Sequence, residues 1–244
     1  GTDLLRRMNL DNSRDHLGVM FSAGKARGTV THFNGATGRD KFDAYALGGY
    51  WTHFGQGGWY VDSVLQGTRY SAETTANRGL RPFRTRGNGI SASAEGGKPY
   101  RFDSGYFIEP QAQLIYQTIN LKDGNDNGAR VTFSGVKSLV GRIGARFGRT
   151  WSMDDDASNE RQMSVWVRPN IWREFQGDST TRFSSADGAI PFQSSLGGSW
   201  GETSVGISGQ FSRNTTVFAS GSYQTRLDGG GHAYNAKVGL RINW

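Results

Sequence analysis

The chain has 244 residues, of which 35% are hydrophobic and 12% aromatic, with a mean hydropathy of −0.58 and a formal net charge of +7. The aromatic content argues against disorder, and the absence of cysteine excludes a disulfide framework and a thiolate metal site. No run approaches the ~18 apolar residues that a membrane-spanning helix needs. A transmembrane barrel remains compatible with the low hydropathy, because only its outer face is apolar.

Apolar and polar residues alternate along the whole chain, and this pattern is typical of β-strands. Alternation and turn signals predict eleven strand segments. In chain order they are Thr2–Met8, His16–Val30, Phe42–Phe54, Gly58–Ala72, Asn88–Arg101, Tyr106–Leu121, Val136–Ser152, Gln162–Gln176, Gln193–Phe211, Thr215–Arg226 and His232–Trp244.

Polar, glycine-rich breaks separate these segments, and short and long breaks roughly alternate. The short ones include GQGG and SRN, and the long ones include NGATGRDK, LKDGNDNG and DSTTRFSSADG. Short turns on one side of a membrane and long loops on the other are the pattern of outer-membrane barrels. We find no interdomain linker and predict a single domain over residues 1–244.

The last segment divides into two unlike faces, because side chains two positions apart point the same way on a strand. Lys237 and Arg241 lie on a polar or small-residue face. The other face is apolar and includes Tyr234, Val238, Leu240, Ile242 and Trp244.

The same division recurs in other segments, so we expect a set of polar side chains to face a lumen. An arginine on the lipid face could cost ~2–4 kcal/mol at mid-membrane, whereas in a lumen it is solvated or paired. For any single residue of this set, a specific role in contacting a polypeptide and a merely solvated position in the lumen are equally compatible with the pattern. The predicted lumen-facing residues are Asp62, Gln66, Glu109, Gln111, Gln113, Arg142, Arg146, Arg168, Asn170, Glu174, Lys237 and Arg241.

A soluble sandwich also alternates, but two features favour a barrel in the membrane. The segments are long, whereas a soluble strand usually has ~5–6 residues. Aromatic residues gather near strand ends, as interfacial girdles require. They are Tyr50, Trp51, Trp59, Tyr60, Tyr100, Tyr106, Trp151, Trp200 and Trp244. The predicted fold is therefore an all-β, transmembrane, antiparallel up-and-down barrel. Single-chain bacterial barrels use an even number of strands, so an odd count implies either an overlooked strand or a strand outside this chain.

Several stretches resemble the C-terminal translocator domain of autotransporters, the type V secretion proteins, and most closely the pertactin/AIDA adhesin group. FIEPQAQLIY at Phe107–Tyr116 and the aromatic-ended VGLRINW at Val238–Trp244 are the most specific. The others are Gly1–Leu5, Gly18–Ala26, Tyr45–Gly55, Gly57–Gln66, Gly89–Tyr100 and Gly141–Gly148.

This resemblance implies a 12-stranded barrel in the bacterial outer membrane, with a linker helix in the lumen that leads to an N-terminal passenger. Gly1–Leu5 is similar to the second strand of that pattern, so the first strand and the linker would precede Gly1. The implied function is export and anchoring of the passenger at the cell surface. The implied partners are outer-membrane lipid, the chain's own linker and passenger, and the outer-membrane β-barrel assembly machinery.

The terminal strand carries an additional expectation. An apolar, alternating strand with a final aromatic residue is similar to the signal that the assembly machinery reads, and an exposed strand edge can pair with another edge. The alternative is that Trp244 is only an interfacial anchor, and we favour both roles together.

No catalytic or cofactor signature accompanies these features. The four histidines, His16, His32, His53 and His232, lack ligand spacing, and Lys and Arg are too dispersed to indicate nucleic-acid binding. We expect no enzyme activity, metal or cofactor. Some autotransporters cut their own passenger with lumen carboxylates, and Glu109 and Asp62 would be the candidates here. A porin-like channel and a soluble carbohydrate-binding module remain alternatives.

Overall fold

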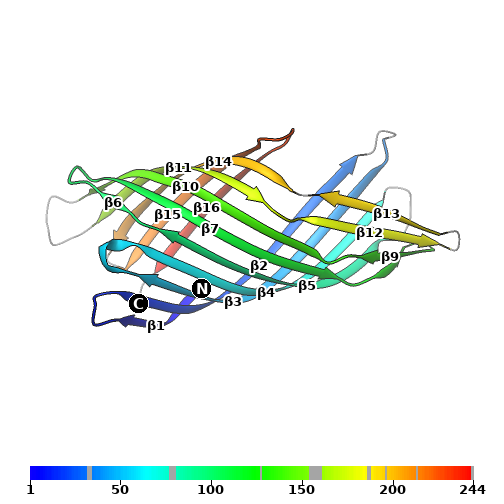
Figure 1. Ribbon diagram of the computed structural model, residues 1–244, viewed down its shortest axis with the longest axis horizontal. Helices are drawn as coiled ribbons and strands as arrows, with labels where there is room; N and C mark the ends of the chain where they lie inside the picture. The colour runs from blue at the N-terminus through cyan, green and yellow to red at the C-terminus, as the bar shows by residue number, and fades with distance from the viewer. Residues whose placement is uncertain are drawn as a thin grey trace.

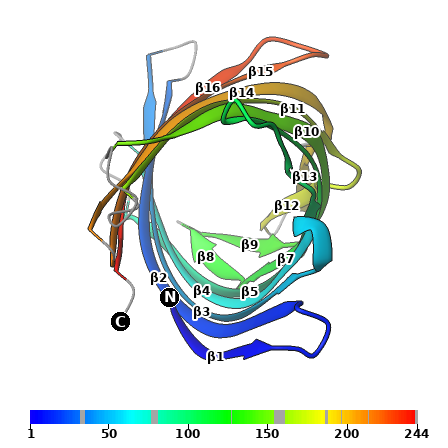
Figure 2. The same cartoon turned by 90° about the vertical axis from the view of Figure 1, so that its left-hand side faces the viewer.

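The computed structural model describes residues 1–31, 35–76, 81–126, 128–153, 161–185, 188–195, 197–212 and 214–242. Within these ranges the protein consists of antiparallel strands and one short 3-10 segment, η1 (Gln56–Gly58). The principal sheet curls around a central axis, as the end-on view in Figure 2 shows. In this part of the chain no helix has the length and apolarity needed to cross a membrane.

Eleven described strands of the principal sheet pair with their neighbours in up-and-down order, and the two-residue β6 (Tyr100–Arg101) pairs only with β7 (Figure 1). The expected all-β antiparallel fold is confirmed. The strands in spatial order are β1 (Thr2–Met8), β2 (Arg14–Thr31), β3 (Thr37–Phe54), β4 (Tyr60–Ala76), β5 (Phe83–Gly97), β7 (Tyr106–Leu121), β10 (Val136–Ser152), β11 (Gln162–Glu174), β14 (Gly198–Ser212), β15 (Thr215–Arg226) and β16 (His232–Ile242).

Most strand limits agree with the predicted segments, and β7, β10 and β15 agree at both ends. The largest errors at strand starts are five residues. The predicted segment Gln193–Phe211 wrongly combines the end of β13 (Gly188–Ser195) with β14, which begins at Gly198. β3 begins at Thr37 instead of Phe42, and β5 begins at Phe83 instead of Asn88. Arg84 and Arg86 lie on the outward face of β5, and this polar extension conceals the alternation. Polar extensions likewise lengthen β2 and β3 at their shared hairpin.

Two connections that the sequence predicts to be loops contain strands instead. LKDGNDNG includes β8 (Gly124–Asp126), and DSTTRFSSADG includes β12 (Asp178–Ser185). With β9 (Ala129–Phe133) and β13 (Gly188–Ser195) they form a separate four-stranded sheet at one end of the molecule (Figure 1). β12 lacks a clear alternation of polar and apolar residues, and β9 alternates over only five residues, so the sequence pattern misses this sheet. We call this end of the molecule the long-loop end and the opposite end the short-turn end.

A charged link joins two elements at the long-loop end. Asp228, in the connection between β15 and β16, accepts hydrogen bonds from the backbone N–H of Ser199 at 3.0 Å and from Nε of Arg226 at 3.2 Å. The Ser199 N–H contributes most to lowering the pKa of the Asp228 carboxyl. The link therefore ties the start of β14 to the last hairpin.

The burial pattern is inverted relative to a soluble protein. Among the described residues, nine polar or charged residues are buried but only four hydrophobic ones. Large apolar side chains instead cover the outward surface, where Leu47 is 68% exposed and Val238 is 82% exposed. A soluble sandwich would bury its apolar face between two sheets, so this distribution excludes that alternative.

The predicted aromatic girdle is only partly correct. Trp51 and Tyr106 are exposed and on outward-facing positions, as expected. Tyr50, Tyr60 and Trp200 instead point inward, because their positions in the alternation match those of the inner polar residues. Trp244 lies outside the described residues.

The sheet has two unpaired edges within the described ranges. β1 pairs only with β2, and β16 pairs only with β15. An unpaired edge presents a row of N–H and C=O groups that require partners in an apolar medium.

Close packing of the inner face gives the first prediction. A Cβ atom added at Gly206 would overlap the Trp166 indole, whereas Gly67 on the outward face has no atom within 4 Å of such a Cβ. We expect Gly206→Ala to destabilise the folded sheet by about 1–3 kcal/mol, because overpacking forces neighbours from their rotamers.

Gly67→Ala is the matched control and should leave stability unchanged. Urea unfolding of the protein in detergent micelles, followed by tryptophan fluorescence, measures both. Equal stability of the two variants would contradict this packing.

Candidate functional site

A network of polar and charged side chains occupies the middle of the inner face. Its members come from seven strands, namely β4, β5, β7, β10, β11, β14 and β15, and each stands at an alternate position whose neighbours face outward. Arg142, for example, lies opposite Gln113 on β7 and Trp172 on β11, while Ile143 beside it points outward and is 63% exposed. The two-residue period of the strand thus brings together side chains that are far apart in sequence.

Glu109 is the acceptor at one end of this network. The side chain is 4% exposed and forms an ion pair with Arg146. It also accepts hydrogen bonds from the Tyr60 hydroxyl at 3.0 Å and from Nε2 of Gln111 at 2.7 Å. Tyr60 lies 3.0 Å from Glu95 as well, so one hydroxyl connects two carboxylates.

Arg142 lies at the centre of the network, with only 2% of its side chain exposed. Its Nη2 lies 2.8 Å from Oε2 of Glu95, and its Nη1 donates to Asn170 at 3.2 Å. Asn170 in turn donates to Glu202 at 2.9 Å. Glu202 also accepts hydrogen bonds from Ser204 at 2.9 Å and Gln224 at 2.6 Å, so the network reaches β15.

Inward-facing indoles support the guanidinium groups. Arg142 lies 5.4 Å from the centre of the Trp172 ring, and Arg168 lies 5.6 Å from that of Trp166. Trp172 stacks on Trp200 with 5.9 Å between ring centres. Cation–π contacts of this kind contribute about 0.5–2 kcal/mol, and they hold the long arginine side chains against the wall.

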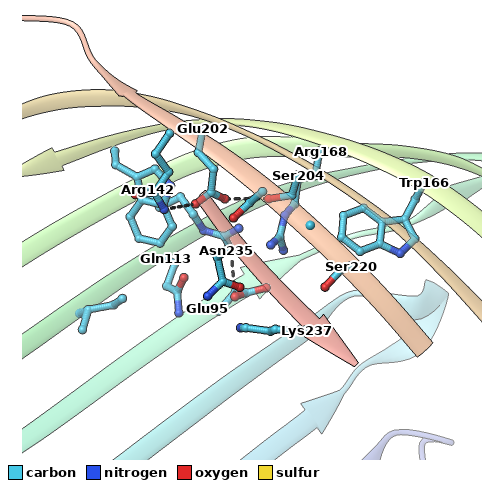
Figure 3. Close-up of a pocket in the computed structure, with 15 residues that line it drawn as sticks. Glu95, Gln113, Arg142, Trp166, Arg168, Glu202, Ser204, Ser220, Asn235 and Lys237 are labelled. Carbon is cyan, nitrogen blue, oxygen red and sulfur yellow. Dashed lines mark hydrogen bonds and ion pairs between the residues drawn. The ribbon is translucent and has the colours of Figure 1, made fainter. Parts of the chain in front are cut away.

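A cavity of about 400 Å³ opens beside this network, and Figure 3 shows charged side chains from facing strands directed toward it. Nε of Arg168 and Nε1 of Trp172 are buried without a hydrogen-bond partner in the described structure. The cavity is lined by Glu95, Gln113, Ile115, Arg142, Trp166, Arg168, Trp172, Glu202, Ser204, Ser220, Gly221, Ser222, Gln224, Asn235 and Lys237.

A second cavity of about 610 Å³ lies toward the short-turn end. Glu109, Arg146 and Tyr60 line it together with the turn that contains η1. The two cavities share no lining residue, and the network of Glu109, Arg142 and their partners lies between them.

The inner wall presents both hydrogen-bond donors and hydrogen-bond acceptors to a polar segment in the lumen. The three carboxylates Glu95, Glu109 and Glu202 accompany the three arginines 142, 146 and 168, and Lys237 adds a further cation. A wall of mixed sign can hydrogen-bond to peptide groups and charged side chains of a polypeptide in the lumen.

The remaining predicted residues lie apart from this network. Asp62 accepts a hydrogen bond from Thr52, and Gln66 donates to Thr68 at 3.3 Å, both on the β3–β4 side. Glu174 is buried and accepts from Ser138 and from the Leu139 N–H. Arg241 shares the inward face of β16 with Lys237 and is exposed.

The described contacts do not bring Glu109 and Asp62 together. Asp62 lies opposite Glu95 across β4 and β5, and the Tyr60 hydroxyl joins Glu95 to Glu109. Glu109 is already paired with Arg146. No group of three or more potential metal ligands occurs among the described residues, and His32 lies outside them.

Sequence reasoning did not select several members of the network. Glu95 lies inside the predicted segment Asn88–Arg101, and its alternation with Ala92 and Ala94 was the signal that could have identified it. Tyr60 was assigned to an interfacial girdle on account of its position at a strand end. Trp166, Trp172 and Glu202 fall on the polar face by alternation, and this was the signal that could have identified them.

Comparisons with known proteins identify relatives of this chain. A model of the autotransporter β-domain family matches residues 1–222. The pertactin autotransporter of Bordetella bronchiseptica is 28% identical over 215 residues, which cover 86% of this chain and 22% of that protein. The BrkA autotransporter of Bordetella pertussis is 35% identical over 118 residues, or 46% of this chain and 12% of that protein. The chain thus spans about a fifth of the pertactin relative.

Two solved structures share the fold. The transport unit of the autotransporter AIDA-I from Escherichia coli superposes with a TM-score of 0.83 at 20% identity, covering 99% of this chain and 80% of that one. The β domain of the Bordetella autotransporter BrkA gives 0.63 at 19% identity, covering 98% and 95%.

The Arg142–Glu95 ion pair gives the second prediction. We expect Arg142→Gln to lower the free energy of unfolding by about 3 kcal/mol, because removing one partner leaves the other charge uncompensated in a poorly solvated site. The double variant Arg142→Gln, Glu95→Gln should recover part of this loss.

Urea unfolding in detergent micelles completes the double-mutant cycle, and Lys237→Gln, at an exposed position, serves as the control. Losses that simply add in the double variant would show that the two side chains do not interact.

Proposed function

Because this chain belongs to the autotransporter β-domain family, we propose that it is an outer-membrane translocator that exports and anchors an N-terminal passenger at the bacterial cell surface. The observation that carries the proposal is the inverted burial, with a charged inner wall and an exposed apolar exterior. A barrel in lipid requires this arrangement. The family is one of translocator domains rather than catalytic domains.

The dimensions of the sheet support a membrane location. β2 has 18 residues, or about 60 Å at ~3.3 Å per residue, so it exceeds the ~25 Å apolar band of an outer membrane. By the usual asymmetry of these barrels, the short-turn end faces the periplasm and the long-loop end faces the exterior. The small β8–β9–β12–β13 sheet then stands outside the cell.

The inner wall suits a polypeptide occupant. The proposed occupants are the chain's own linker helix and, during export, the passenger. Arg168 and Trp172 retain donors without acceptors beside the 400 Å³ cavity, and backbone carbonyl or carboxylate groups of a linker could satisfy them. The predicted lumen-facing residues serve, in this proposal, as the wetted and paired surface along which that segment lies.

Closure of the barrel follows from its two edges. We propose that one further strand of the same polypeptide pairs with β1 and β16, so that residues 1–244 form a single domain from the second strand onward. Both edges lack a partner within the described residues, and an unpaired edge in hydrocarbon costs several kcal/mol for each orphaned group.

The last strand is proposed to interact with the outer-membrane assembly machinery. Tyr234, Val238, Leu240 and Ile242 present an exposed apolar face beside the free edge of β16. Such an edge can pair with the edge of another barrel. Trp244 completes the same face by sequence and lies outside the described residues.

Surface display of the passenger tests the proposed function. Cells that produce the intact protein with an epitope in the passenger are treated with an external protease. We expect the epitope to be removed from the intact protein, whereas deletion of residues 232–242 should keep it inside the cell.

Fractionation of the same cells separates the alternatives. Protein in the outer membrane without surface passenger, together with faster uptake of small solutes, would support a porin-like channel instead. Recovery of native protein without detergent would refute the membrane location.

A further inference from the structure

A cluster of cations lies on the outward face of β2 to β5, beyond the apolar band toward the long-loop end. Arg39 lies one row nearer the long-loop end and is also exposed. The six side chains between that row and the apolar band are Lys25, Arg27, Lys41, Arg69, Arg84 and Arg86, and all are exposed. We call them the basic belt. Their outward orientation follows from the alternation, since Asp62, Tyr50 and Glu95 on the same strands point inward.

Strand register places these cations in adjacent rows. Arg27, Lys41 and Arg84 share one row with Glu73, and Lys25 and Arg86 share the next row with Asp43. Arg69 and Tyr45 stand in the row nearest the apolar band. Neighbouring side chains within a row are ~4.5–5.5 Å apart at Cβ, so the belt forms one continuous patch.

The charges within the belt do not balance. Glu73 lies 2.7 Å from Nε of Arg84 and 3.6 Å from Nζ of Lys41, and Asp43 lies 3.7 Å from Nζ of Lys25. Within the described residues, no carboxylate pairs with Arg27, Arg69 or Arg86. Six cations therefore share two carboxylates, and like charges this close repel unless an external anion compensates them.

The position of the belt indicates where that anion lies. The next row toward the short-turn end is apolar and exposed, with Phe21 at 67%, Leu47 at 68% and Ile90 at 56%. Asp15 lies on β2 at the opposite rim of the sheet, and Ala23 lies on the same strand in the row of Arg69. The eight residue steps between them correspond to about 20 Å along the membrane normal, if the strand rises ~3.3 Å per residue and is tilted by ~40°. The belt consequently begins at the outer headgroup level, where Tyr45 is suited to an interfacial position.

We propose that the basic belt binds the phosphate groups of anionic lipid in the outer leaflet, on one side of the barrel only. The inference rests on the proposed membrane location. On the outward surface of the other described strands at this end, Lys137 and Arg173 are isolated, and Arg173 lies over the Phe175 ring at 5.7 Å. The lipid contact is thus confined to β2–β5, and it orders lipid on that face.

Lipid selectivity tests the proposal with the intact protein in phosphatidylcholine vesicles. Trace spin-labelled phosphatidylglycerol or phosphatidylcholine reports the association constant of each lipid with the protein surface. We expect a preference for the anionic lipid that Arg27→Gln, Arg69→Gln, Arg86→Gln together reduce by ~3-fold or more, since each cation near a membrane surface contributes up to ~5-fold to binding of anionic lipid. High salt should weaken the preference.

Two matched variants distinguish charge at the belt from other effects. Lys137→Gln, Arg173→Gln should retain the preference, and Arg27→Lys, Arg69→Lys, Arg86→Lys should retain most of it. Retention by the glutamine variant, or an equal loss in the Lys137/Arg173 control, would overturn the proposal.

A competition arm settles the source of the phosphate. Inorganic phosphate at constant ionic strength should not displace the labelled lipid; displacement would show a free-anion site and overturn the lipid assignment. A protein that enters vesicles but lacks selectivity refutes only this inference. A protein that never enters the membrane fraction refutes the proposed function itself.

Discussion

The alternation of side chains along each strand is the constraint on which the rest of this structure depends. Backbone pairing fixes adjacent strands in register, so one face of every strand joins a common inner wall and the other a common exterior. A shift of one residue would move Arg142 and Glu109 outward and Ile143 and Ile108 inward. Register therefore fixes both the exposed apolar band and the charged network.

The inner network shows why such a wall contains mixed charges. Removing carboxylates and guanidiniums from water is costly, and a pair is tolerated only where further hydrogen bonds complete its geometry. Glu109 has three such partners and Glu202 also has three. The wall is consequently extensively hydrogen-bonded while still presenting donors to the cavity. The basic belt differs, because its outward cations exceed the carboxylates around them.

Much of the fold could be predicted from the sequence, because alternation is a local property. The limits of β7, β10 and β15 followed from it directly. Polar strand extensions outside the apolar band show no alternation of apolar and polar residues. The sequence pattern therefore does not predict the start of β5 or any part of β12. At the start of β5 the outward positions carry Arg84 and Arg86 instead of apolar residues, so hydrophobicity no longer reports the orientation of the strand.

The candidate site was less accessible to sequence reasoning. Alternation assigns a face, but it does not say which inner residues meet across the sheet, because that depends on register and curvature. Tyr60 illustrates the limit: a tyrosine at a strand end suits an interface, yet its hydroxyl joins Glu95 to Glu109 inside. Asp62 lies on the same face as Glu109 and still has separate partners.

Cysteine accessibility along β16 tests the central claim most directly, because the chain contains no cysteine. In outer membranes that contain the intact protein, Lys237→Cys and Arg241→Cys should react with a charged maleimide, whereas Val238→Cys and Leu240→Cys should react only after denaturation. Uniform reactivity along the strand would contradict a wetted inner wall opposed to a lipid-facing exterior.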